Sequence, residues 1–281
     1  MVSRALRTAR RSNLAHRGLT LLELVVVLTI LAALAGILIP MLPNMLRRSH
    51  KAAEATQTAE IGKYIQTYQA LYFSYPDNYD LLTDGTTFPA YLPAETTGSP
   101  FGGFVTAGTL TAAEAEALQK VGINYVQPLA KDTETTADGF HCTSNPYPAG
   151  LLANQRLVSD SSLKFAVIDP SVSGRVPTCL ETLVAADPTA RYVVFGLGPR
   201  CSIVGHGIQE APVAIPQNKD FTPATRYSRI GVIFKVSGKD VASAENRARF
   251  VAAVALEDDD LEGTEGGVVG YYDVARDPRL E

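Results

Sequence analysis

The residues of this chain that could do chemistry are an acidic run, three cysteines and one carboxylate at the edge of an apolar segment. The acidic run holds six carboxylates within residues 257–265. Clustered oxygen ligands beside a glycine suit Ca²⁺, which takes roughly six to eight oxygens. The spacing is not that of an EF-hand, and a solvated acidic loop is the commoner explanation. The run is therefore a candidate calcium site, with the ligands Asp258, Asp259, Asp260, Glu262 and Glu265.

The three cysteines, Cys142, Cys179 and Cys201, allow at most one internal disulfide. Buried free thiols explain them equally well. An oxidising compartment would favour a bridge, but the sequence does not select the pair. A zinc cluster of these cysteines with His141 and His206 is disfavoured, because structural zinc sites use short C-x₂-C spacings and the chain has none.

Catalysis and nucleic-acid binding have little support. The chain lacks G-x-S-x-G, H-E-x-x-H and G-x-x-x-x-G-K-[ST], so we predict that it is not an enzyme. Its formal net charge is −4, and residues 1–18 contribute five arginines and no acid, which leaves −9 for the rest. Because phosphates require clustered Lys and Arg, we expect no nucleic-acid partner.

A long apolar segment lies near the N-terminus. Residues 24–46 hold no charged side chain, and 23 helical residues rise about 34 Å, enough to cross a hydrocarbon core of ~30 Å. The arginines of residues 1–18 indicate that this end is cytoplasmic. Arg47, Arg48 and Lys51 on the other flank weaken that indication.

Three ordinary explanations compete for such a start. A secretory signal peptide with cleavage after Ala35 would end before the apolar run does. Arg10-Arg11 is a weak twin-arginine match in an arginine-rich leader. A plain membrane anchor explains the length but gives Glu23 no role, although an ionisable group there costs roughly 2 to 3 kcal/mol unless it is paired.

The stretch Arg17-Gly18-Leu19-Thr20-Leu21-Leu22-Glu23 resembles the processing site of type IV prepilins. The resemblance implies that a prepilin peptidase cleaves after Gly18 and methylates the new amino terminus, Leu19, where phenylalanine is usual in the family. Glu23 then becomes the fifth mature residue, whose carboxylate meets the free amine of a neighbouring subunit during assembly. Pro40 corresponds to the helix-kinking proline of many pilins, although a helix that ends near Pro40 remains an alternative.

The resemblance implies a structural subunit of a type IV filament, either a type IV pilin or a pseudopilin of type II secretion. Its partners would be copies of itself, other pilin-like subunits, the prepilin peptidase and an inner-membrane platform with its ATPase. It would cross the bacterial inner membrane once, with its head in the periplasm or on an extracellular filament. Major pseudopilins hold calcium in a C-terminal loop, so the acidic run fits this family. The alternatives are a minor tip subunit and a membrane-anchored periplasmic binding module that never polymerises.

The elements follow from residue spacing. Apolar residues three and four apart from Ile61 to Tyr72 predict an amphipathic helix that extends the membrane helix to Phe73. Tyr75-Pro76 should end it, because the residue before proline avoids helical angles, and residues 75–82 resemble the helix-to-loop junction of pseudopilins. We therefore expect four parts: a leader (1–18), a membrane and assembly helix (19–46), its amphipathic continuation (47–73) and a head (74–281).

Within the head, Thr111-Ala112-Ala113-Glu114 predicts a capping box that begins a short helix ending at Gly122. Residues 83–108 and 131–150 have loop composition. Residues 241–256 fit helix or strand. Strands are predicted at 163–168, 191–197, 202–204 and 230–236. The expected fold class is α+β, with an antiparallel sheet packed on the outer half of the long helix and joined by long loops.

Overall fold

The computed structural model describes residues 21–89, 91–92, 105–129, 154–157, 162–170, 178–213, 227, 229–239, 241, 246–257 and 267–270. The chain divides into two compact units, Met1–Leu46 and Arg47–Glu281.

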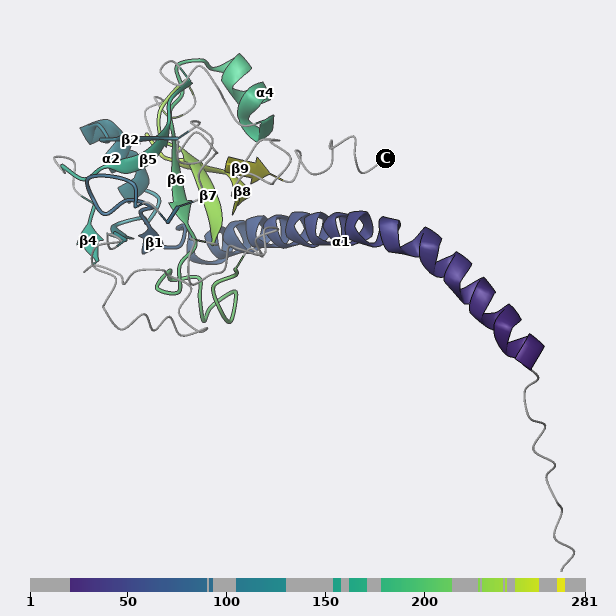
Figure 1. Cartoon of the computed structure of the whole chain (residues 1–281). Coiled ribbons are helices and arrows are strands. Elements are labelled where there is room, and N and C mark those ends of the chain that lie inside the picture. The colour runs from purple at the N-terminus through teal and green to yellow at the C-terminus, as the bar shows by residue number, and fades with distance from the viewer. Residues whose placement is uncertain are drawn as a thin grey trace, which may run out of the picture. The chain divides into compact units, whose positions relative to one another are not determined.

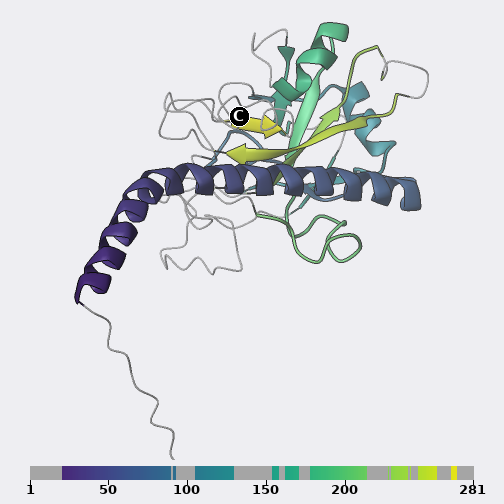
Figure 2. The same cartoon turned by 90° about the vertical axis from the view of Figure 1, so that its right-hand side faces the viewer.

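The described part of the first unit is helical. It belongs to α1, which runs unbroken over Leu21–Tyr72 (Figures 1 and 2). Proline at 40 and 43 removes two backbone donors from the helix interior, yet the helix continues through both positions. The alternative in which the helix ends near Pro40 is therefore wrong.

The outer end of α1 lies one residue from the predicted end at Phe73. The helix ends at Tyr72, and Phe73 takes a left-handed conformation with φ 55°. Tyr75 and Pro76 follow as buried residues of the head. The left-handed residue turns the chain, and its amide still donates to the Gln69 carbonyl at 2.9 Å.

The second unit contains one sheet in the strand order β4-β3-β1-β6-β7-β8-β9, with β5 also paired to β6 and β2 to β5. The prediction of an antiparallel sheet needs one correction: β1 and β3 are parallel, while the other neighbouring pairs among the described strands are antiparallel. The α+β class is confirmed. The strands are β1 Tyr79–Asp80, β2 Thr106–Gly108, β3 Tyr125–Gln127, β4 Gln155–Arg156, β5 Phe165–Ile168, β6 Tyr192–Gly196, β7 Ile230–Lys235, β8 Arg249–Glu257 and β9 Gly267–Gly270.

The three longest predicted strands are confirmed as β5, β6 and β7, with ends that differ by one or two residues. Residues 202–204 are wrong as a strand: they lie in a turn, where Val204 makes one isolated bridge to Ile208. The described part of 241–256 is strand from Arg249 onward. Helix α2, Ala112–Gln119, has the predicted capping box. Helix α4, Thr178–Ala186, was not predicted.

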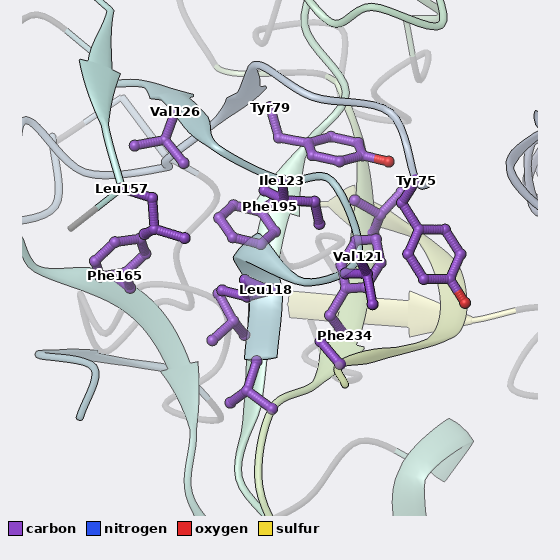
Figure 3. Close-up of a cluster of buried hydrophobic side chains, with 14 of the residues drawn as sticks. Tyr75, Tyr79, Leu118, Val121, Ile123, Val126, Leu157, Phe165, Phe195 and Phe234 are labelled. Atoms are coloured by element: carbon purple, nitrogen blue, oxygen red, sulfur yellow. The ribbon is translucent and has the colours of Figure 1, made fainter. Parts of the chain in front are cut away.

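The sheet buries side chains on both faces. On one face, Ile61 and Ile65 of α1 join a cluster with Phe195 and Phe234. Figure 3 shows Tyr75 and Leu118 in the same cluster. The rings interlock, with centroids 6.0 Å apart for Phe195 and Phe234 and 5.2 Å for Tyr75 and Phe234.

The opposite face of the sheet carries every second residue of each strand, because successive side chains along a strand point to opposite faces. Tyr192, Val194 and Ile233 belong to a second cluster there, together with Leu180 of α4. The head is thus two apolar layers separated by one sheet, with the outer part of α1 contributing to the first.

Candidate functional site

The N-terminal segment carries the residues for which sequence analysis predicted processing and assembly. Gly18 and Leu19 lie outside the described residues, which begin at Leu21. Glu23 lies in the first turn of α1. A carboxylate there interacts favourably with the positive end of the helix dipole. Pro40 lies inside α1, where the structure shows no break.

Leu21–Ile39 of α1 is long and apolar enough to cross a membrane. At about 1.5 Å per residue, its 19 residues rise roughly 28 Å. None of this window is buried within the molecule, and Leu21, Leu31 and Ile39 expose 81%, 55% and 65% of their surface. So much exposed apolar surface indicates an apolar environment outside the chain.

Asp77 holds together the junction at which α1 meets the head. Its Oδ1 accepts from the backbone amides of Asn78, Asn124 and Tyr125 at 2.9, 2.8 and 2.8 Å. Its own amide donates to Ser202 Oγ at 2.8 Å, and the Ser202 amide donates to the Asp77 carbonyl at 2.9 Å. One carboxylate therefore joins the end of α1 to two distant segments. Sequence analysis singled out the tract but not this role.

A second polar contact lies deeper in the head. The Tyr227 hydroxyl donates to Asp80 Oδ2 at 2.7 Å, and both residues are buried. Gly196 lies beneath the ring: a Cβ built there would be 1.8 Å from Tyr227 Oη. Glycine is therefore required at 196 for close packing, and no local pattern in the sequence indicates it.

Asp187 forms a third polar centre after α4. Its Oδ2 accepts from the Lys239 amide at 2.7 Å and from Lys235 Nζ at 3.1 Å, and its Oδ1 accepts from Thr189 Oγ1 at 2.8 Å. The Lys239 amide, followed by the Thr189 hydroxyl and then Lys235, holds the pKa of Asp187 well below its usual range. The site links α4 to the turn after β7 and is structural in character.

Glu114 has two roles, of which only one was predicted. It completes the capping box, accepting from the Thr111 amide at 2.8 Å. Its carboxylate also receives Arg191 Nη1, with both oxygens at 2.7 Å. Arg191 Nε lies 3.2 Å from Asp169 Oδ2. The pair ties α2 to the start of β6 and has the strong geometry of a charge-assisted contact.

The cysteine prediction is corrected in part. Cys201 is a buried free thiol, so a bridge to Cys201 is wrong. Burial raises the pKa of this thiol strongly, which leaves it protonated and unreactive. Cys142 and the side chain of Cys179 lie outside the described residues, and their pairing stays a prediction.

The metal predictions are mostly untested. The candidate calcium ligands Asp258, Asp259, Asp260, Glu262 and Glu265 lie outside the described residues. Within the part of the chain that the structure describes, no group of three or more His, Cys, Asp or Glu side chains could hold a metal. Among the described residues, neither Cys201 nor His206 belongs to a group of side chains that could hold zinc.

Comparison with known proteins gives one match. Residues 13–39 match the family model of the prokaryotic N-terminal methylation motif. The matched segment includes Gly18, Leu19 and Glu23 and stops one residue before Pro40. Searches of curated proteins and of solved structures gave no significant match.

The match covers the leader and the apolar segment but leaves the head unassigned. The chain therefore combines a helix of the kind that anchors a protein by a single span with a prepilin-type signal, the hallmark of type IV pilins and pseudopilins.

Proposed function

We propose that this protein is a structural subunit of a type IV filament, either a pilin or a type II secretion pseudopilin, and not an enzyme. The prepilin peptidase cleaves after Gly18, and α1 then holds the protein in the inner membrane with its head in the periplasm. An assembly platform driven by an ATPase transfers the subunit from the membrane into a filament, alongside copies of itself and other pilin-like subunits.

The observation that carries the proposal is the methylation motif on an exposed apolar helix that continues into a folded head. Lateral packing of such helices exchanges one apolar environment for another, so a membrane segment can leave lipid at little cost. Glu23, the acid at the start of this helix, meets the free amine of a neighbouring subunit during assembly.

The first test is the intact mass and N-terminal sequence of the protein recovered from membranes of a host that has a prepilin peptidase. We expect a start at Leu19 with the added mass of one methyl group. Gly18→Val, which places a bulky side chain at the cleaved bond, should leave the leader attached. A start at Met1 in the native chain would indicate an anchored module, and a start at Gly36 would indicate a secreted protein; either contradicts the proposal.

The second test separates processing from assembly. Glu23→Gln should be cleaved but absent from the filament fraction sheared from cells. The reason is that the side chain at position 23 no longer carries the charge that attracts the amine of a neighbouring subunit. Glu60→Gln is the matched control, since Glu60 is an exposed acid on the same helix. Absence of the native protein from that fraction would favour the membrane-anchored binding module, and normal recovery of Glu23→Gln would contradict the assembly role of Glu23.

A further inference from the structure

A basic cluster follows the apolar segment and lies outside the methylation motif, which ends at residue 39. Arg47, Arg48 and Lys51 come directly after Leu46, and no acid occurs between Glu23 and Glu54. The positive-inside tendency explains the leader arginines but not positive charge on the opposite flank. These three residues therefore need another explanation.

The length of the apolar segment indicates where these residues begin in a membrane, because the helical rise per residue converts position within the segment into depth. Residues 24–46 rise about 34 Å, slightly more than a hydrocarbon core of ~30 Å. Residues 47–51 then begin where the lipid phosphates lie. Positions 47 and 51 are four apart and positions 48 and 51 three apart, the spacing of neighbours on one helix face.

We propose that Arg47, Arg48 and Lys51 form a basic collar on α1 that binds the phosphates of anionic lipids in the leaflet on the head side of the membrane. The inference rests on the proposed function, because it requires residues 24–46 to span the bilayer. Guanidinium groups bind phosphate through paired N–H donors, and lysine adds a point charge. Long basic side chains at helix ends reach the interface from within the apolar region.

Charge favours lipid as the occupant of the collar. Residues 1–51 carry a net +7, so the whole-chain charge of −4 leaves −11 for residues 52–281. An anionic leaflet repels a region that acidic, and a collar at the point of attachment offsets the repulsion. Lipid phosphates also surround a spanning helix before any second subunit is present. An acidic segment of a neighbouring copy is the competing occupant.

The test uses the absence of tryptophan from the chain. Met45→Trp, at an exposed position beside the collar, introduces a single fluorophore into the full-length protein. The protein is reconstituted in bilayers that contain either brominated phosphatidylglycerol or brominated phosphatidylcholine, and tryptophan quenching is compared. The collar variant adds Arg47→Gln, Arg48→Gln and Lys51→Gln. The control adds Lys63→Gln, Lys120→Gln and Lys164→Gln, which remove the same charge from positions outside the collar.

We expect the brominated anionic lipid to be preferred by about fivefold at low salt, with the preference reduced at high salt. The collar variant should lose most of this preference, and the control variant should keep it. The proposal is overturned if both lipids quench the Met45→Trp protein equally. It is also overturned if the collar variant and the control variant lose the lipid preference to the same extent. A collar variant that keeps the preference for the anionic lipid also overturns the proposal. So does cross-linking of the collar to a second copy of the chain when no lipid preference is seen. No quenching by either lipid contradicts the membrane span and hence the proposed function itself.

Discussion

The apolar half of α1 exposes its leucine and valine side chains, whereas the sheet of the head buries side chains of the same kind. Leu31 in the first unit exposes 55% of its surface, whereas Leu118 in α2 exposes none. The head buries leucine, valine and phenylalanine side chains in two clusters, one on each face of the sheet. The leucines and valines from Leu21 to Leu42 of the first unit are exposed.

The difference shows that, among the described residues, apolar burial within the chain is concentrated in the head. Burial of apolar surface provides the main favourable free energy of folding, and the head obtains it internally. The apolar window Leu21–Ile39 of the first unit is not buried within the molecule, so its favourable burial must come from an apolar environment outside the chain. Substitutions of one kind should therefore have different consequences in the two regions.

The largest expected contrast is between two leucine truncations. Leu118→Ala should lower the free energy of unfolding of the head by about 2–5 kcal/mol, because it leaves a cavity in the core. Leu31→Ala should change it by less than about 0.5 kcal/mol. Urea unfolding of the full-length protein in detergent, followed by near-UV circular dichroism of its tyrosines, measures both. Equal effects would contradict the separation of the two regions.

Two glycine substitutions, one in each region, test the same difference. Gly196→Ala should lower the free energy of unfolding by about 1–3 kcal/mol, because the new Cβ displaces Tyr227 from Asp80. Gly36→Ala, in the exposed segment, has nothing within 4 Å of the new Cβ. It should leave the urea midpoint of the head unchanged. If Gly196→Ala is as stable as the native protein and keeps the contact between Tyr227 and Asp80, then Gly196 and Tyr227 do not pack as closely as described.

The Asp187 site predicts a pH-dependent contribution to the stability of the head. Its pKa is lower in the folded protein than in the unfolded chain, so its stabilisation is present above a pH of about 4 and is lost as the pH falls further. Native protein should therefore exceed Asp187→Asn in unfolding free energy by more at pH 7 than at pH 3. Glu116→Gln, which breaks only the exposed pair with Lys120, is the control and should show little dependence. A difference that grows toward acid pH would contradict the assignment.

The smallest effect concerns a phenol in the core. Among the described residues, the buried hydroxyl of Tyr79 has no hydrogen-bond partner, and burial raises its pKa. Tyr79→Phe should stabilise the head by up to about 1 kcal/mol, because it removes an unpaired polar atom. Tyr68→Phe instead removes a 3.3 Å contact with Ser202 Oγ and should be neutral or slightly destabilising. Urea unfolding ranks the two, and a destabilised Tyr79→Phe would reveal a missing partner.

Local signals account for what could be predicted of the fold. The capping box at Thr111 and Glu114 depends on residues three apart, and strands β5, β6 and β7 are dense apolar runs. The turn at 202–204 was mistaken for a strand because its composition is apolar, while its backbone is held by Asp77, far away in sequence. Strands of two or three residues, such as β1 and β3, carry too little periodicity to be recognised.

The sequence by itself determined the membrane segment, the methylation motif and the position of Glu23, because charge, length and short spacing are properties of neighbouring residues. Only the tertiary structure decided that β1 and β3 run parallel, that Cys201 is a buried free thiol and that Gly196 lies beneath Tyr227. The Asp80–Tyr227 contact joins residues 147 positions apart. Such contacts form because the folded chain brings distant segments into close packing, and no local pattern records which segments will meet.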